Sequence, residues 1–204
     1  MKYGNTAFFN IYGRNLPNIL FILLIFCILQ SCNSIKIKKE KIDFSSYSDT
    51  YVRPAANQKR ANAFLEIYST YGTRADFEKQ LLRFLKHQNN VSMYHDISWF
   101  LNKKSGYTPI DNIPLAEKVL LQGINRIKGD DIEARGGKCM LLWDMTYLFY
   151  STNQMEKALT WARKILNQPV DNENDYSCSD MPPALHDGKS TEAFHSFVMS
   201  AKSK

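Results

Sequence analysis

The amino-acid sequence predicts an all-α protein. Apolar residues recur three and four positions apart after residue 59, as at Phe64, Ile67, Tyr68 and Tyr71, and this spacing places them on one face of a helix. No stretch shows the sustained alternation of apolar and polar residues that predicts a half-buried strand. The chain has 204 residues, of which 44% are hydrophobic, so its composition is that of a globular protein with one core.

Turn-forming and capping residues divide this region into six helices. Gly72 separates the first two, and Pro114 suits the first position of the fourth. Asp130 and then Gly136-Gly137 are expected to break the chain between the fourth and fifth helices, and Pro169 stops the sixth. The first helix is expected to begin near Lys59, and the third is expected to run from Ser92 to about Lys103.

The second, fourth and sixth helices share a repeated pattern. FEKQLLRF from Phe77, AEKVLLQG from Ala116 and MEKALTWA from Met155 place Glu-Lys-x-Leu at a period of 39 residues. An aromatic-rich helix precedes each of them, so the chain is predicted to form three helical hairpins. Hairpins that bury their apolar faces against one another form a short α-solenoid. A compact helical bundle built from the same hairpins is the alternative.

The last hairpin, YLFYSTNQMEKALTWARKILNQP, resembles a tetratricopeptide repeat in its short turn and in Ala158, Ala162 and Pro169. The resemblance implies a tetratricopeptide-like α-solenoid. The chain departs from that family in its period of 39 residues, where the family has about 34. It also lacks the family's Trp-x-x-Leu-Gly start at Trp99 and Trp143, and its middle hairpin carries a longer turn.

The N-terminal segment has the features of an export signal. The apolar run Ile19–Leu29 is shorter than the roughly 20 residues that a membrane-spanning helix needs. It follows a segment with two basic residues, Lys2 and Arg14, and no acidic one. We therefore expect residues 1–31 to be a signal peptide and not a membrane span.

Leu29-Gln30-Ser31-Cys32 resembles the lipobox of bacterial lipoproteins. The resemblance implies cleavage between Ser31 and Cys32, a diacylglyceryl group on the Cys32 thiol, and acylation of the new amino group by a fatty acid such as palmitate. A plain cysteine after an uncleaved anchor is the alternative. The residues after Cys32 lack the aspartate or acidic cluster that redirects such lipoproteins, so the resemblance implies the periplasmic face of the outer membrane.

Composition and charge suggest four segments: a signal peptide over 1–31, a flexible tether over 32–58, a helical-repeat domain over 59–169, and an acidic loop with a C-terminal capping helix over 170–204. Basic and acidic residues balance over 61–204, whereas the N-terminal end is basic. A nucleic-acid-binding domain carries its basic residues on the folded part, so none is expected. The four lysines between 36 and 41 either contact anionic lipid or belong to a solvated tether.

Few residues suggest chemistry. The chain has no Gly-x-Ser-x-Gly or Ser-x-x-Lys sequence and no glycine-rich phosphate loop. The stretch 171–175 alternates oxygen ligands but lacks the glycine of a calcium loop, and the histidines lack zinc-site spacing. We expect no metal and no cofactor. Cys139 is a thiol nucleophile, a buried helix residue, or one half of a disulfide with Cys178 in an oxidising compartment.

The expected function is therefore binding and not catalysis. The first hypothesis is a lipid-anchored envelope protein that acts as a protein-binding or assembly module. The alternative is a periplasmic immunity or inhibitor protein that neutralises a secreted toxin enzyme. An enzyme that uses Cys139 is a third hypothesis. The tryptophans Trp99, Trp143 and Trp161 are expected in the helical core and not along a ligand groove.

Overall fold

Eight α-helices occupy the part of the chain that the computed structural model describes, which is residues 40–53, 55–88, 90–169, 177–180 and 188–203. Three short 3-10 helices accompany them, at Lys103–Ser105, Cys178–Asp180 and Ala201–Ser203. The α-helices are α2 (Ser45–Val52), α3 (Asn57–Tyr71), α4 (Phe77–Lys86), α5 (Ser92–Phe100), α6 (Ile113–Arg126), α7 (Ile132–Ser151), α8 (Met155–Leu166) and α9 (Gly188–Ser200).

The all-α prediction is confirmed. In the described residues, β pairing is limited to one isolated bridge between Asn102 and Asp111. Helices α3 to α8 are the six expected ones, and the side-chain oxygen of Asn112 caps α6 by accepting a hydrogen bond from Leu115 N at 3.2 Å. Pro114 lies in the first turn of α6, where its missing N–H costs nothing.

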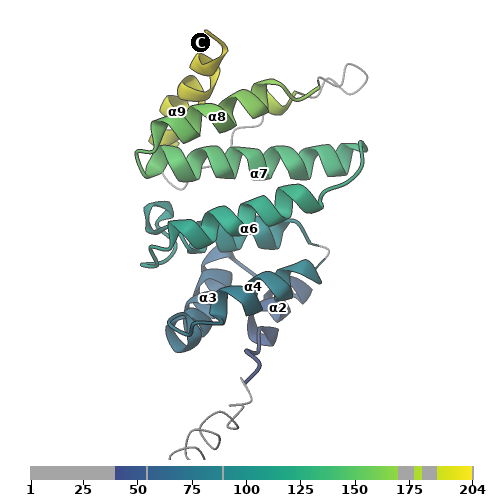
Figure 1. Ribbon diagram of the computed structural model, residues 1–204, viewed down its shortest axis with the longest axis vertical. Coiled ribbons are helices and arrows are strands. Elements are labelled where there is room, and N and C mark those ends of the chain that lie inside the picture. Colours follow the sequence, from purple (N-terminus) through teal and green to yellow (C-terminus); the bar gives the residue numbers. More distant parts are fainter. Residues whose placement is uncertain (1–39, 54, 89, 170–176, 181–187, 204) are drawn as a thin grey trace, which may run out of the picture. The chain divides into compact units, whose positions relative to one another are not determined.

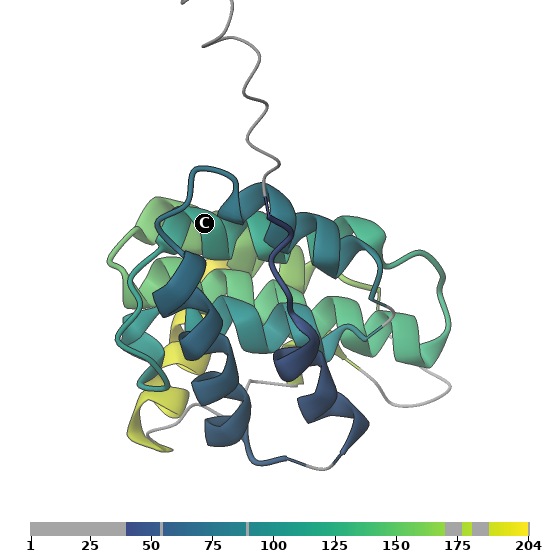
Figure 2. The ribbon, with the colours of Figure 1, turned by 90° about the horizontal axis from the view of Figure 1, so that it is seen from below.

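The helices pack in the order of the sequence. Helix α5 packs against α6. Helix α7 packs against α8, and Figure 1 shows these two helices side by side. The aromatic-rich helices α3, α5 and α7 also contact one another in succession, as do α4 and α6. Each hairpin thus covers the next one along the chain. Figure 2 shows α2 and α3, which contact each other, side by side in front of the later helices.

The repeated Glu-Lys pairs of the sequence come together in this arrangement. Lys118 Nζ lies 2.6 Å from Glu78 Oε1, and Lys157 Nζ lies 3.6 Å from Glu117 Oε2. The lysine of each repeated Glu-Lys pair therefore contacts the glutamate of the pair one period earlier in the sequence. The pairs run from α4 to α6 and from α6 to α8, so the repeat in the sequence corresponds to neighbouring positions in space.

The core has two parts. The larger part joins α2 to α8 and includes Phe64, Leu81, Phe100 and Phe149, all at most 1% exposed. The second part lies between α7, α8 and α9, where Trp143 packs edge-on against Phe194 with ring centroids 5.5 Å apart. Helix α9 matches the C-terminal helix expected within 170–204, and it completes this second part of the core.

The expected tether over 32–58 is wrong from Ile42 onward, and the folded part starts there and not at residue 59. Ile42, Phe44 and Tyr47 are buried, and α2 lies inside the expected tether. Ile42 N–H donates to Gln80 Oε1 at 2.8 Å, and the ring of Phe44 stacks on Phe84 of α4. The many serines and tyrosines of this stretch obscure the helical spacing of its apolar residues in the sequence. Its structure depends on contacts with α4.

The break between α6 and α7 includes the expected Asp130 but not Gly136-Gly137, because α7 continues through both glycines. Its first turn is capped by Asp131, whose Oδ1 accepts a hydrogen bond from Ala134 N at 2.8 Å. A Cβ at Gly137 would lie 3.4 Å from Val91 and 3.6 Å from Ile127, which are ordinary van der Waals distances. Gly137 therefore does not end the helix, and no close approach of neighbouring segments requires a glycine there.

Candidate functional site

A cluster of charged and aromatic side chains lies where α2, α3, α5 and α7 meet. We call its six members the polar network: Tyr51, Arg60, His95, Asp96, Trp99 and Asp144. The side chain of Asp144 is 0% exposed and that of Asp96 is 7%, whereas those of Arg60 and His95 are 22% and 27% exposed. Charged groups are rarely buried without partners, so each carboxylate needs one.

Asp144 of α7 has two partners, and both come from α5. His95 Nδ1 lies 2.8 Å from Asp144 Oδ2, and Trp99 Nε1–H donates to Asp144 Oδ1 at 2.8 Å. His95 and Trp99 are four residues apart, so they lie on one face of α5. Both oxygens of this buried carboxylate are therefore satisfied by a single neighbouring helix.

Asp96 connects α5 with the first two helices. The Tyr51 hydroxyl donates to Asp96 Oδ2, and Arg60 Nη1 lies 3.4 Å from the same oxygen. The guanidinium of Arg60 also lies over the Tyr51 ring, 4.8 Å from its centroid. His95 Nε2 is 3.9 Å from Asp96 Oδ1. His95 therefore lies between two carboxylates.

These surroundings hold His95 in its charged form. Burial by itself lowers the pKa of His95, but the charge and hydrogen bond of Asp144, with the charge of Asp96, outweigh burial and raise that pKa to about 9. The imidazole is therefore protonated at neutral pH and donates hydrogen bonds. A general base must accept a proton near the working pH, so this arrangement suits an ion pair better than base catalysis.

Burial affects the neighbouring groups as well. It raises the pKa of Asp96, and the hydrogen bond from Tyr51 acts in the opposite direction. Burial also raises the pKa of Tyr51 and that of Tyr47, whose hydroxyls are 2.8 Å apart. Both tyrosines therefore stay protonated at neutral pH and keep a hydroxyl hydrogen to donate.

The polar network reaches the surface beside an aromatic pair. Trp99 is buried, and its ring stacks on Tyr147 with centroids 5.1 Å apart and an interplanar angle of 15°. Tyr147 is half-buried, like Arg60 and His95. Three side chains suited to contacts with a partner therefore lie on the first helices of the hairpins, held by groups beneath them.

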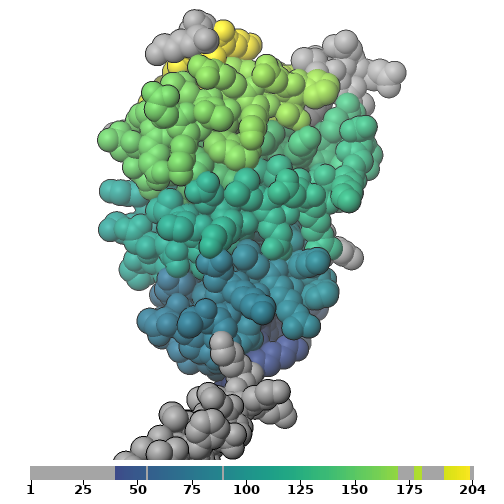
Figure 3. Space-filling model, in the orientation of Figure 1, coloured from purple at the N-terminus to yellow at the C-terminus, as the bar shows by residue number. Residues whose placement is uncertain are grey.

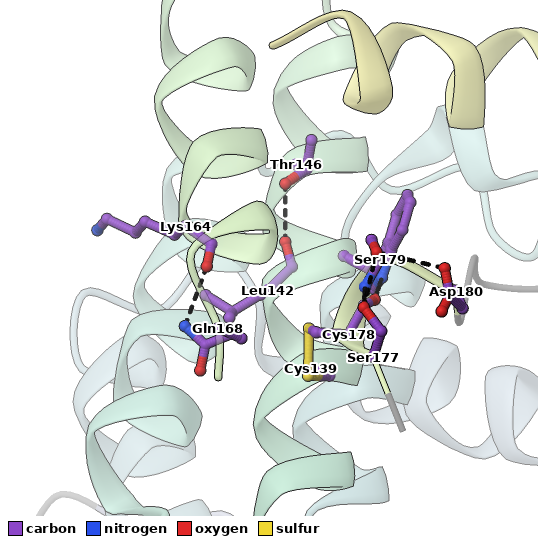
Figure 4. Close-up of a disulfide and its surroundings, with 10 residues drawn as sticks. Cys139, Leu142, Thr146, Lys164, Gln168, Ser177, Cys178, Ser179 and Asp180 are labelled. Carbon is purple, nitrogen blue, oxygen red and sulfur yellow. Dashed lines mark hydrogen bonds between the residues drawn. A yellow bond between two sulfur atoms is a disulfide. The ribbon is translucent and has the colours of Figure 1, made fainter. Parts of the chain in front are cut away.

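The structure joins the two cysteines that the sequence suggested as a pair. Cys139 of α7 and Cys178 form a disulfide with their Cα atoms 5.5 Å apart (Figure 4). Trp143 Nε1–H, one turn along α7, donates to Cys178 O at 2.8 Å. The bond and the hydrogen bond fix the short 3-10 helix Cys178–Asp180 against α7. A disulfide sulfur is not a nucleophilic thiol, so Cys139 cannot act as one in this state.

Several predicted features lie outside the described residues. They are the signal peptide 1–31, the cleavage site at Ser31 and Cys32, and the stretch 171–175. Within the described ranges, no group of three His, Cys, Asp or Glu side chains could hold a metal ion. None of the described helices is long and apolar enough to cross a membrane.

The polar network was not predicted from the sequence. Asp96 and Asp144 are each the one acidic residue in the aromatic-rich stretches SMYHDISWF and LLWDMTYLFY, and this is the signal that marks them. Tyr51 and Arg60, the partners of Asp96, were not predictable, because Tyr51 lies in the stretch that the sequence assigned to a tether and Arg60 belongs to another helix.

Comparisons of the chain with protein-family models, with curated proteins and with solved structures gave no match. The proposals below therefore depend on the residues and geometry of this chain.

Proposed function

We propose that this protein is a lipid-anchored component of a bacterial cell envelope that binds a protein partner through the first helices of its hairpins. The observation that carries the proposal is the polar network, in which buried carboxylates hold the partly exposed Arg60 and His95 and in which Trp99 stacks on Tyr147. Arginine and tyrosine are enriched at protein interfaces and among the residues that dominate binding energy.

The rigidity of these side chains supports a binding role. Arg60 is held by Asp96 and by the Tyr51 ring, and His95 is held by Asp144. A long side chain that is already fixed loses less conformational entropy when a partner arrives. Buried ion pairs are a weak source of stability compared with apolar packing. Their presence here is better explained by the surface groups that they orient.

The lipid anchor is proposed at Cys32, after cleavage following Ser31. Several acyl chains bury enough CH₂ groups, at about 0.8 kcal/mol each, to keep a protein on a bilayer. The test is metabolic labelling with palmitate. The full chain is expected to incorporate label, whereas the Cys32→Ser chain is not. The Cys27→Ser chain is the matched control and should label normally. Labelling of the Cys32→Ser chain would contradict the anchor.

The binding face is tested by photo-crosslinking in intact cells. A photoreactive amino acid at Tyr147 is expected to capture a specific protein, and the same group at Lys118 on α6 is the control. Arg60→Gln, which keeps an N–H donor beside Asp96 and adds no repelling charge, should weaken the capture, and circular dichroism checks that the variant stays folded. Equal capture from both positions would contradict a face on the first helices. A captured toxin enzyme would identify the partner as a target for inhibition, and an envelope-assembly component would indicate a scaffold role.

A further inference from the structure

The second helices of the hairpins, α4, α6 and α8, carry an excess of basic residues. They contain three acidic residues, Glu78, Glu117 and Glu156, against eight basic ones. The basic residues are Lys79, Arg83, Lys86, Lys118, Arg126, Lys157, Arg163 and Lys164. Because charges balance over residues 61–204 as a whole, the basic residues are segregated onto these three helices. We call their outer surface the basic face.

The acidic residues of the basic face are largely neutralised within it. Glu78 pairs with Lys118, and Glu117 pairs with Lys157. Arg126 keeps its charge, although its Nη1 donates to the carbonyl oxygen of Leu85 at 3.2 Å. The positive charge that remains therefore comes from Arg126 and from the basic side chains of α4 and α8 other than Lys157.

Three of these side chains lie along one face of α4. Lys79, Arg83 and Lys86 are separated by four and three residues, so they form one stripe along α4. All three are exposed, and so are Lys157 and Lys164, which occupy the positions of Lys79 and Lys86 two repeats later. Figure 3 shows successive bands of blue, teal and green on one face, in the sequence order of α4, α6 and α8.

A partly exposed tryptophan lies within the basic face. Trp161 of α8 is half-buried, and Lys164 Nζ lies 3.5 Å from the centroid of its ring. The other two tryptophans are buried, with Trp99 5% exposed and Trp143 0%. Tryptophan beside lysine is typical of surfaces at the boundary between a bilayer and water, where the ring and the charge both find suitable surroundings.

We propose that the basic face docks onto anionic lipid headgroups of the bilayer that carries the lipid anchor. The inference rests on the proposed attachment at Cys32. Nine residues separate Cys32 from Ile42, and such a segment can extend at most about 35 Å. The folded part begins directly on α4, since Ile42 donates to Gln80 and Phe44 stacks on Phe84. The anchor therefore keeps α4, the first helix of the basic face, near headgroups.

This docking leaves the polar network free. Its residues belong to α2, α3, α5 and α7, none of which contributes to the basic face. A protein held by its lipid and by the basic face would present the first helices of its hairpins to a partner in a fixed orientation. Restricting a tethered protein to one orientation raises its effective concentration for a partner in the same compartment.

The experiment uses Trp161 as a probe of distance to the bilayer. The full chain is reconstituted into vesicles of phosphatidylcholine, or of equal phosphatidylcholine and phosphatidylglycerol, each containing a headgroup-spin-labelled lipid that quenches fluorescence. Quenching of Trp161 is expected only in the anionic vesicles, and raising the salt concentration should remove it by screening. A Trp161→Phe chain gives the background from the two buried tryptophans.

Matched variants separate the basic face from net charge. In the Lys79→Gln/Lys86→Gln/Lys164→Gln chain, the salt-sensitive quenching should fall by at least a factor of ten. The reason is that each basic residue near an anionic surface strengthens the binding constant about fivefold. The Lys59→Gln/Lys103→Gln/Lys104→Gln chain removes the same charge from outside α4, α6 and α8 and should behave like the original. All six lysines are exposed.

Every other result overturns the docking. The docking is overturned if quenching is equal in neutral and anionic vesicles, or if it is absent from both. It is also overturned if the two triple variants lose quenching equally. Failure of the chain to co-sediment with neutral vesicles would count against the anchor, so the two failures are distinguishable.

Discussion

His95 shows how a single residue combines burial with charge. Its imidazole is mostly covered, yet it stays protonated because Asp144 lies 2.8 Å away and Asp96 lies 3.9 Å away. A group whose pKa is higher in the folded than in the unfolded state binds its proton more tightly when folded. The stability of the protein therefore depends on the proton that His95 holds.

The free energy of unfolding should consequently fall as pH rises through the upper neutral range. The contribution of His95 is complete below its ordinary pKa of 6.5 and is lost as pH rises through about 9. A rise of this size in the pKa of His95 contributes at most about 3 kcal/mol to the free energy of unfolding. Urea unfolding at a series of pH values between these limits measures the loss.

Two variants should flatten this pH dependence. Asp144→Asn removes the charge that holds the proton, and His95→Gln removes the titrating group, so both should lose most of the slope. Asp111→Asn is the matched control, because Asp111 forms an exposed ion pair with Lys103 at 2.9 Å, and such pairs contribute little. An unchanged slope in both network variants would show that another group titrates.

At the scale of helices, glycines have roles that depend on what they face. Gly123 lies in α6 and Gly137 in α7, both inside helices, where glycine costs about 1 kcal/mol relative to alanine. A Cβ on Gly123 would lie 2.7 Å from Leu141 Cδ1 and 2.9 Å from Tyr94 Cγ, whereas one on Gly137 would meet only ordinary contacts. The two glycines therefore differ in the space that surrounds them.

Gly123→Ala should destabilise the protein by about 1–3 kcal/mol, because the added methyl group overpacks the contact of α6 with α5 and α7. Gly137→Ala is the matched comparison and should be neutral or stabilising by up to about 1 kcal/mol. Chemical denaturation of the two proteins measures both values. Equal effects of the two substitutions would mean that α6 can move away from its neighbours without cost.

The disulfide acts on the element that precedes α9. Cys139 and Cys178 are 39 residues apart in sequence, and closing a loop of this length restricts the unfolded chain by about 4 kcal/mol in the chain-entropy description. Reduction should therefore lower the free energy of unfolding by about 2–4 kcal/mol. The Cys139→Ser/Cys178→Ser protein should already show the lower value.

Thermal unfolding with and without a reductant measures this effect. The double serine variant should be insensitive to the reductant, because it has no disulfide to lose. In hydrogen exchange, reduction should speed the exchange of the backbone amides of α9 more than that of the amides of helices α3 to α6. The reason is that α9 packs on the part of the core next to the disulfide. Uniform loss of protection along the chain would contradict this local role.

For the whole molecule, the position at which the fold begins is the main consequence of tertiary contacts. Ile42, Phe44 and Tyr47 are 2%, 5% and 0% exposed, and the side chains of these residues fill space between α3 and α4. Removing one large apolar side chain from a core costs about 3–5 kcal/mol, and a domain of this kind has about 5–15 kcal/mol of stability.

Truncation tests this boundary. A chain starting at Lys41 should retain the helical content and cooperative unfolding of the longer protein. A chain starting at Arg53 loses all three buried side chains and should not fold cooperatively. Circular dichroism during thermal unfolding distinguishes the two. A cooperative transition in the shorter chain would mean that α2 is an accessory to the core.

The sequence by itself determined the helical class, the presence of the six helices α3 to α8 and the repeated Glu-Lys sequence. These features are local, because helix formation depends on residues three and four positions apart. The two cysteines of the body could also be named as a pair from the sequence, although only the structure brings them together. The signal peptide and Cys32 remain predictions, because they lie outside the described residues.

Only the tertiary structure decided where the fold begins, whether α7 passes through its glycines, and which groups surround His95. Tyr51 and Asp144 belong to one network although 93 positions separate them in the numbering. Contacts of this kind depend on how helices pack, and packing is set by side chains that are distant in sequence. The same reason explains why Glu78 meets Lys118 and Glu117 meets Lys157, since α4, α6 and α8 lie in repeat order.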